Sequence, residues 1–288
     1  MTGELRPRRS VLYMPSSNPK ALEKAKSIPC DAIIFDLEDA VAPDAKPTAR
    51  EQAVAAVTSG EYGSRELTIR CNGLATPWGT EDIAAAGAAR PSAVVIPKVS
   101  SPAELDVVAA GLDAAGGTDT MIWAMVETPT AIFDVRAIAA HPRVAVLVMG
   151  TNDLAKEILA PLVPGRANLT PYLATAVLAA REAGKVILDG VYNAIADAEG
   201  FAAECRQGVE MGFDGKTLVH PSQVDPANAA WSPTSEEAEF AGRVIAAYEE
   251  AEAEGRGVIT VDGKMIEHLH VANARRVLAI TDAIAAMG

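Results

Sequence analysis

Short apolar stretches rich in β-branched residues recur along the chain, and each lasts three to six residues. They lack the strict alternation of polar and apolar positions, which is typical of strands buried on both faces of a parallel sheet. We therefore predict eight strands, at residues 10–14, 32–37, 66–70, 93–96, 121–126, 144–149, 185–188 and 217–219.

Longer alanine-rich amphipathic stretches separate these strands, and we predict helices at residues 19–27, 47–58, 80–89, 102–115, 130–140, 171–183 and 198–212. Ser101 followed by Pro102 illustrates their start signals, because proline favours the first helical position. Regular strand–helix alternation with eight strands favours an α/β fold of the (β/α)8 TIM-barrel type over residues 1–230. A doubly wound open sheet stays the alternative, since patterns alone miscount strands.

The segment from residue 231 to residue 288 has a different pattern. An acidic helix is predicted over residues 235–254, a glycine-containing break over 255–257, an extended piece over 258–261 and a second helix over 264–287. A barrel does not need this segment, so we interpret it as a C-terminal helical extension that forms a lid or a subunit contact.

Composition excludes several classes of protein. The 288 residues carry 25 Lys and Arg against 38 Asp and Glu, a net charge of −13, which argues against a nucleic-acid partner. No apolar run is long enough to span a bilayer, and no signal-peptide pattern follows Met1. The three cysteines are scattered, as in reduced proteins, so we expect a cytoplasmic location.

Charged residues follow the apolar runs at nearly every predicted strand end, where a β/α barrel carries its chemistry. Glu127 and Asp153 come after consecutive strands. Two carboxylates, completed by water and substrate oxygens, suit Mg²⁺, although either residue could instead cap a helix. Their joint placement favours a metal site.

Arg70 ends a strand and has two interpretations. It could neutralise Asp36 or Glu38, or it could provide a fixed cation for a substrate carboxylate or a developing enolate. Lys98 has the same two interpretations with weaker support.

Gly150, Thr151 and Asn152 offer small residues and backbone N–H groups before a short helical pattern, and are candidates for binding an anion or a carboxylate. The sequence contains no G-x-G-x-x-G, P-loop or G-x-S-x-G motif, which disfavours dinucleotide, nucleotide and serine-hydrolase functions.

Several motifs together resemble the citrate lyase β-subunit-like family of CoA-ester lyases, in the HpcH/HpaI aldolase group. They lie at residues 9–15 (Arg-Ser-Val-Leu-Tyr-Met-Pro), 35–43 (Phe-Asp-Leu-Glu-Asp-Ala-Val-Ala-Pro), 126–129 (Val-Glu-Thr-Pro), 149–154 (Met-Gly-Thr-Asn-Asp-Leu) and 212–221 (Gly-Phe-Asp-Gly-Lys-Thr-Leu-Val-His-Pro). Residues 150–157, 189–193 and 261–267 look most like the (S)-malyl-CoA thioesterase branch, which is close to malyl-CoA lyase.

The resemblance implies a TIM barrel that assembles into a homotrimer or a hexamer, with Mg²⁺ held by Glu127 and Asp153 and substrate oxygens bound by Arg70. It also implies a C-terminal segment that delivers an acid/base carboxyl to a neighbouring subunit. The family has aspartate there, whereas this chain has Glu267. The extra methylene moves the carboxyl by ~1.5 Å, and a misplacement near ~1 Å costs about 100-fold in rate, which favours thioester hydrolysis over carbon–carbon cleavage.

The implied function is a Mg²⁺-dependent enzyme for a short 3-hydroxy-dicarboxyl-CoA thioester such as (S)-malyl-CoA. It either cleaves the substrate to acetyl-CoA and glyoxylate or hydrolyses it to malate and CoA. Alternatives are a citramalyl-CoA or citryl-CoA lyase, a CoA-independent pyruvate or oxaloacetate aldolase, and a degenerate CoA-ester-binding subunit. We expect Arg70, Glu267, Asp36 and Glu38 to act in catalysis, and the substrate to meet Arg70, Glu127, Gly150, Thr151, Asn152 and Lys98.

Overall fold

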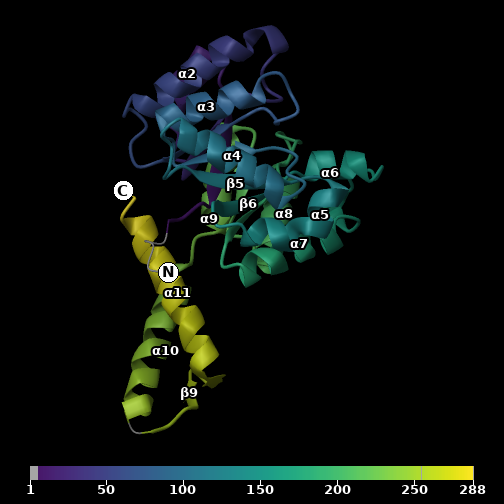
Figure 1. Ribbon diagram of the computed structural model, residues 1–288. Coiled ribbons are helices and arrows are strands. Elements are labelled where there is room, and N and C mark those ends of the chain that lie inside the picture. Colours follow the sequence, from purple (N-terminus) through teal and green to yellow (C-terminus); the bar gives the residue numbers. More distant parts are fainter. Residues whose placement is uncertain (1–5, 254, 288) are drawn as a thin grey trace. The chain divides into compact units, whose positions relative to one another are not determined.

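The computed structural model describes residues 6–253 and 255–287 (Figure 1). These residues form two compact units. One contains residues 8–230, and the other contains residues 231–287 together with residues 6 and 7. Each unit is described by itself.

The larger unit is a closed barrel of parallel strands in which each strand pairs with the next and the last pairs with the first. Its strands are β1 (Ser10–Pro15), β2 (Ala32–Asp36), β3 (Glu66–Arg70), β4 (Ala93–Ile96), β5 (Met121–Val126), β6 (Val144–Met149), β7 (Val186–Asp189) and β8 (Gly215–Leu218). The (β/α)8 prediction is confirmed, and the open-sheet alternative is wrong, because β1 and β8 close the sheet through the pairs Ser10–Lys216 and Leu12–Leu218.

Helices follow the strands around the barrel. They are α1 (Pro19–Ala25), α2 (Lys46–Thr58), α3 (Gly79–Ala89), α4 (Pro102–Ala114), α5 (Pro129–Ala140), α6 (Thr151–Glu157), α7 (Thr170–Glu182), α8 (Ala198–Met211) and α9 (Val224–Ala230), with 3₁₀ turns η1 (Pro43–Ala45), η2 (Pro164–Arg166) and η3 (Pro221–Gln223). Side chains cap several starts: Asn18 accepts from the Ala21 N–H and Thr128 accepts from the Ala131 N–H. Ser101 precedes α4, but its side chain makes no capping hydrogen bond. Instead, the Glu104 carboxylate accepts a hydrogen bond from the Ser100 N–H.

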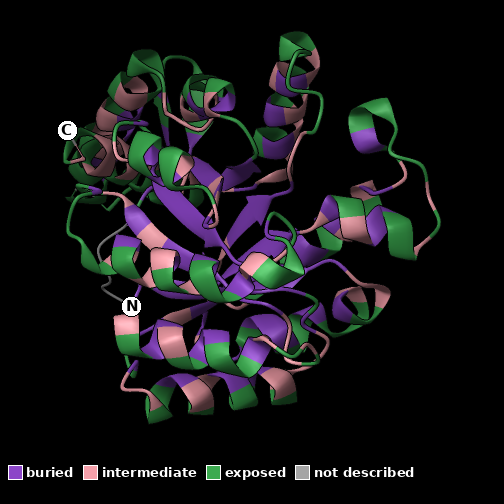
Figure 2. Cartoon of the chain, turned by 90° about the horizontal axis from the view of Figure 1, so that it is seen from above, coloured by how far each residue is buried: buried purple, intermediate pink, exposed green. Residues whose placement is uncertain are grey.

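The interior of the barrel is apolar. Figure 2 shows the strands as buried and the surrounding helices as exposed on their outer faces. Val11, Ile34, Val95, Trp123 and Val148 belong to one buried cluster, which is drawn from β1, β2, β4, β5, β6 and β7. Alternate positions of each strand fill this core, which leaves polar residues to the strand ends.

Strand β8 begins with two residues that break the apolar pattern, Gly215 and Lys216, so the predicted strand started too late. Gly215 permits a close approach, because a Cβ there would lie 1.8 Å from the carbonyl oxygen of Arg8. The first residues of β8 are therefore determined by their contact with the chain before β1, and hydrophobicity does not reveal them.

The smaller unit contains α10 (Ser235–Ala253), the antiparallel pair β9 (Ile259–Val261) and β10 (Lys264–Ile266), and α11 (His268–Ala285). The two helices pack side by side (Figure 1). The prediction of one helix from residue 264 is wrong for its first four residues, because residues 264–266 form β10 and Glu267 precedes the helix. Asp262 and Gly263 both have positive φ and form a tight turn. The turn reverses the chain, so that β10 pairs with β9.

Cys30, Cys71 and Cys205 are buried free thiols. Within the described residues, no helix is both long and apolar enough to cross a bilayer.

Candidate active site

A cavity of about 450 Å³ opens at the carboxyl ends of the barrel strands. Parallel strands bring their ends to one rim, so residues distant in sequence meet there. We call it the barrel-mouth cavity. Its lining includes the predicted site residues Asp36, Arg70, Glu127, Gly150, Thr151, Asn152 and Asp153.

The cation of this cavity is Arg70, whose guanidinium is held in a fixed orientation. Its Nε and Nη2 atoms donate to the two carboxylate oxygens of Asp36, both at 2.7 Å, and its Nη1 lies 2.9 Å from Glu38. Its guanidinium carbon lies 4.7 Å from the centre of the Tyr13 ring. Burial opposes the charged form, but Asp36 outweighs it, and the pKa of Arg70 is raised well above its usual value.

Glu38 is the second carboxylate on Arg70. Burial raises the pKa of the Glu38 carboxyl, and the charge of Arg70 works against that rise. Arg70 thus neutralises Asp36 and Glu38, which was one of its two predicted roles. The same side chain also lines the cavity. A guanidinium has five N–H donors, so the three contacts to Asp36 and Glu38 leave capacity for a ligand.

Glu127 is buried, with 2% of its surface exposed. Its Oε1 accepts a 2.7 Å hydrogen bond from the backbone N–H of Lys98. Burial, followed by the charge of Glu38, raises the pKa of Glu127 to about 7. Glu127 therefore carries a carboxylate that is costly to ionise unless a cation is supplied.

Gly150 is the residue that makes room for this carboxylate. A Cβ at position 150 would lie 2.2 Å from Oε2 of Glu127 and 2.5 Å from its Cβ. Such contacts are too short for any side chain, so only glycine fits beside Glu127. Gly150 thus has a packing role beside Glu127, and its expected contact with an anion stays a prediction.

Lys98 contributes through both its backbone and its side chain. Its φ of +52° is a left-handed conformation that turns the N–H toward Glu127. Its ammonium nitrogen lies 3.4 Å from Glu38 and 3.7 Å from Asp153. Burial would lower the pKa of Lys98, but these carboxylates and Glu127 outweigh it, and the pKa is raised.

Asp153 lies in the first turn of α6, and its side chain is 26% exposed. Thr151 is buried at the start of that helix. The side-chain amide of Asn152 exchanges two hydrogen bonds with Asn193, at 2.9 and 3.3 Å. The side-chain amide of Asn152 is thus partnered by protein, and the anion contact expected of the backbone N–H groups at residues 150–152 stays a prediction.

The donor set fits a hard divalent cation. The acidic side chains Asp36, Glu38, Asp39, Glu127 and Asp153 outnumber the cations Arg70 and Lys98, and burial raises the pKa of Glu127 and of Glu38. No trio of metal-binding side chains occurs in residues 6–253 or 255–287. Glu127 and Asp153 line the same cavity, and two carboxylates suit Mg²⁺ because this ion keeps several waters, so their role as metal ligands stays a prediction.

The sequence did not predict a buried charge network behind the cavity. Lys216 on β8 is fully buried, and its ammonium donates to Asp189 at 2.9 Å and to Glu204 at 2.8 Å. Arg166 donates to Asp189 at 2.6 Å. The cations outweigh burial and lower the pKa of Asp189. Lys216 lies in the motif at residues 212–221, so a lysine inside an apolar strand is the signal that could have revealed it.

Glu267 lies in the smaller unit, as the residue before α11. Its backbone N–H donates a 2.9 Å hydrogen bond to Nδ1 of His270. His270 thus has a partner within its own helix start, and the predicted acid/base role of Glu267 stays a prediction.

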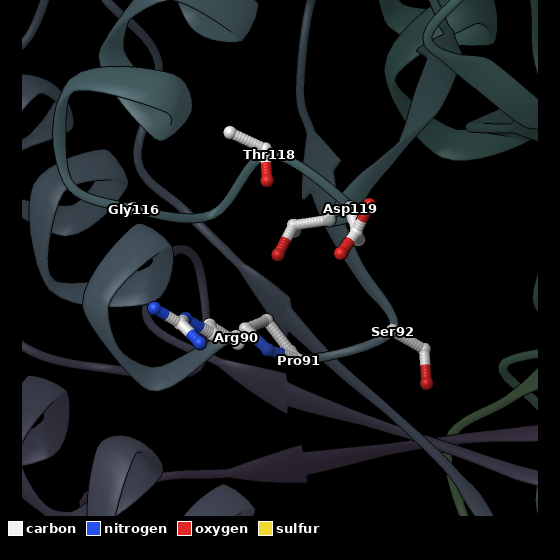
Figure 3. A pocket seen from close by; sticks show the side chains of 7 residues that line it. Arg90, Pro91, Ser92, Gly116, Thr118 and Asp119 are labelled. Carbon is white, nitrogen blue, oxygen red and sulfur yellow. The ribbon is translucent and has the colours of Figure 1, made fainter.

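A different hollow, of about 340 Å³, lies between the turns that precede β4 and β5. Figure 3 shows Arg90, Ser92, Thr118 and Asp119 around it. These turns lie at the amino ends of the strands, away from Glu127 and Asp153, so this hollow is not the candidate active site.

The family model described as HpcH/HpaI aldolase/citrate lyase matches residues 9–221. A (3S)-malyl-CoA thioesterase from Cereibacter sphaeroides (strain KD131 / KCTC 12085) is 50% identical over 286 residues, which cover 99% of this chain and 99% of that protein. A citrate lyase subunit beta from Leuconostoc mesenteroides subsp. cremoris is 34% identical, over 96% of this chain and 94% of that protein.

Solved structures of citrate lyase-like proteins are also similar to this chain. The protein CitE from Mycobacterium tuberculosis, in complex with magnesium, acetoacetate and coenzyme A, matches with a TM-score of 0.79 and 27% identity. The match covers 96% of this chain and all of that one. A citrate lyase from Burkholderia xenovorans has a TM-score of 0.85 at 18% identity, covering 98% of this chain and 93% of that chain, which supports the fold alone.

Proposed function

Because the chain belongs to the HpcH/HpaI aldolase/citrate lyase family, we propose that it hydrolyses a short 3-hydroxy-dicarboxyl-CoA thioester of the (S)-malyl-CoA type. The products are the free hydroxy acid, such as malate, and CoA. The observation that carries the proposal is the pair Glu127 and Asp153 beside Arg70 in the barrel-mouth cavity. The similarity to a (3S)-malyl-CoA thioesterase over 99% of both chains supports it.

Glu127 and Asp153 are the residues we assign to Mg²⁺. When bound, Mg²⁺ supplies a Lewis acid for substrate oxygens and balances the excess negative charge of the cavity. Gly150 and the Lys98 N–H hold the Glu127 carboxylate in place, one by leaving space and the other by a hydrogen bond. The cavity thus has a preorganised wall for an oxygen-rich ligand.

Arg70 binds the oxygens of the substrate through the donors that Asp36 and Glu38 leave open. Because Asp36 holds the guanidinium by two hydrogen bonds, little conformational entropy is lost when a substrate oxygen arrives. Asp36 and Glu38 therefore act through Arg70. We assign no proton transfer to either residue.

Glu267 is proposed as the acid/base carboxyl. It takes a proton from the water that attacks the thioester carbonyl carbon, the carbon–sulfur bond breaks, and the proton passes to the departing thiolate of CoA. We also propose that the protein is a homo-oligomer, a trimer or a hexamer, with this carboxyl supplied to a neighbouring subunit. Light scattering after size exclusion measures that state.

Carbon–carbon cleavage to acetyl-CoA and glyoxylate is the second candidate. The 34% identity to a citrate lyase subunit beta favours it. In that reaction Glu267 protonates the enolate carbon instead of activating water.

One incubation separates the two candidates. Purified protein is mixed with (S)-malyl-CoA and Mg²⁺, and free thiol and glyoxylate are measured in the same tube. Thiol without glyoxylate supports hydrolysis, and glyoxylate without thiol supports cleavage. Absence of both products contradicts the malyl-CoA proposal and directs attention to citramalyl-CoA and citryl-CoA. Turnover of pyruvate or oxaloacetate without CoA would instead support the aldolase alternative.

A further inference from the structure

The loop after β2 fixes the carboxylate that orients Arg70. We call this segment, residues 37–42, the β2 loop. Its backbone N–H groups at Glu38 and Ala40 donate to the two carboxylate oxygens of Asp36, at 2.9 and 3.2 Å. Asp36 in turn holds the guanidinium of Arg70 by two hydrogen bonds, and the Glu38 side chain adds a contact of 2.9 Å. The orientation of Arg70 therefore depends on where the β2 loop lies.

Two carbonyl groups of the β2 loop bind the side chain of Lys46. Its ammonium nitrogen donates to the carbonyl oxygen of Leu37 at 2.8 Å and to that of Glu38 at 2.7 Å. Lys46 is the first residue of α2, it is 5% exposed, and it lies outside the lining of the barrel-mouth cavity. One buried cation thus joins consecutive residues of the loop to a helix of the barrel.

The ammonium of Lys46 lies where a charge is costly to bury. In the part of the chain that the structure describes, no carboxylate forms an ion pair with it. The ring centre of Trp78 lies 5.2 Å from the ammonium nitrogen, and such a contact recovers part of the cost. The burial provides two charge-assisted hydrogen bonds to backbone carbonyl groups, which hold the loop in one position.

A second link reaches the β2 loop, but only at Leu37. The side-chain amide of Asn72 donates to the Leu37 carbonyl at 3.0 Å. The Glu38 carbonyl also accepts from the Val41 N–H at 3.1 Å, which belongs to the same loop. Among the described residues, Lys46 is therefore the one group that joins the Glu38 carbonyl to another element of the barrel.

We propose that Lys46 is a positioning residue for substrate binding. It holds the β2 loop where the loop binds Asp36 and where Glu38 meets Arg70, so that the open N–H groups of Arg70 keep their orientation. The inference rests on the proposed function, because that function assigns the substrate oxygens to Arg70. Since Lys46 lies outside the cavity lining, its loss should raise KM and leave Mg²⁺ binding unchanged.

The first test removes the ammonium in Lys46→Met. The control is Lys24→Met, because Lys24 is an exposed lysine in the last turn of α1. KM and kcat are measured for (S)-malyl-CoA at saturating Mg²⁺. A poorly oriented guanidinium weakens binding, so Lys46→Met should raise KM by about 30-fold and keep kcat within about 3-fold of wild type. Lys24→Met should match wild type. An unchanged KM in Lys46→Met contradicts the inference.

A double-mutant cycle separates positioning from a general loss of structure. Arg70→Lys keeps a cation but has no planar fork to orient. Lys46→Met added to Arg70→Lys should therefore raise KM by less than about 3-fold more. An equal rise in KM in both backgrounds would show that Lys46 acts independently of Arg70, and it would overturn the inference.

A milder variant, Lys46→Gln, tests the same point if Lys46→Met does not fold. Its amide still donates hydrogen bonds, but the side chain is shorter and holds the two carbonyl groups less closely. We expect KM to rise by about 10-fold, and a KM equal to that of wild type would contradict the inference. Calorimetry should give the wild-type affinity for Mg²⁺. Loss of Mg²⁺ binding would also contradict it, because the disruption would then not be confined to Arg70.

Failure of the proposed function is separable from failure of this inference. If wild-type protein turns over no CoA ester, crystal structures of Lys46→Met, Lys46→Gln and Lys24→Met still test the position of the loop. The inference predicts that Glu38 moves beyond ion-pair distance of Arg70, about 4 Å, in the Lys46 variants alone. A Glu38 that keeps its wild-type contact with Arg70 in those variants contradicts the inference, whatever reaction the protein performs.

Discussion

The barrel-mouth cavity adjoins a cavity of about 480 Å³ between η2, the loop after β7 and α8, which we call the side cavity, and the two share a wall but differ in their charge balance. At the barrel mouth, acidic side chains outnumber Arg70 and Lys98, and the pKa of Glu127 rises to about 7. In the side cavity, the largely buried Arg166 and Glu204 are matched by Asp189 and Lys216, whereas Asp197 is exposed and bonded to neutral groups. The difference teaches that an unbalanced buried charge marks a ligand site for ions, and a balanced one a site for neutral groups.

Removal of the Glu127 carboxylate is expected to have the largest effect on the barrel mouth. Glu127→Gln keeps the shape but loses the charge, so Mg²⁺-dependent thiol release should fall by about 1000-fold. Glu157→Gln on α6 is the control, because that residue is exposed and lies outside the cavity lining. Full activity of Glu127→Gln would contradict the claim that the unbalanced charge of the barrel mouth binds Mg²⁺.

The balanced network is expected to matter for stability. Lys216→Met removes one of the two cations that contact both Asp189 and Glu204, the other being Arg166, and breaking such a buried set should lower the free energy of unfolding by about 3–5 kcal/mol. Urea unfolding measures this change. Lys156→Met on the exposed face of α6 serves as the control and should stay within about 0.5 kcal/mol of wild type.

The pH dependence of metal-free protein sharpens the comparison. Glu127 has its pKa raised from 4.5 to about 7, so the folded state holds a proton that the unfolded state loses. The stability linked to this group is present below pH 4.5 and is lost as the pH rises to 7, by up to about 3 kcal/mol. Unfolding in EDTA across this range should show the fall in wild type, and Glu127→Gln should lack it. Identical slopes would show that Glu127 is ionised throughout.

A smaller effect is expected when the space beside Glu127 is filled. Gly150→Ala pushes the carboxylate aside, and a displacement near ~1 Å should lower activity by about 100-fold. Gly73→Ala is the control, because a Cβ there meets nothing within 4 Å. Equal activities of these two variants would mean that the position of Glu127 is not critical.

Much of the fold could be predicted from the sequence, because apolar strands and amphipathic helices alternate with the period of a β/α barrel. The beginning of β8 was missed, since Gly215 and Lys216 reflect contacts made only in three dimensions. The strand β10 was read as helix because a turn with positive φ at Asp262 leaves a weak trace in hydrophobicity.

For the candidate site, the strand-end rule brought Asp36, Arg70, Glu127 and Asp153 to one cavity. It could not provide the pairing of Asn152 with Asn193, because the loop after β7 has no periodic pattern. The close approach of Gly150 to Glu127 could not be predicted from the sequence either, since glycine is common before short helices for other reasons. Side-chain partners depend on loop geometry, which local sequence does not specify.

The most direct measurement is a calorimetric titration of Mg²⁺ into metal-free wild-type protein, Asp153→Asn and Glu157→Gln. Both substitutions remove one carboxylate from α6, but only Asp153 lines the barrel mouth. The account predicts one Mg²⁺ per chain for wild type and Glu157→Gln and a loss of binding for Asp153→Asn. Equal Mg²⁺ binding by all three proteins would contradict it.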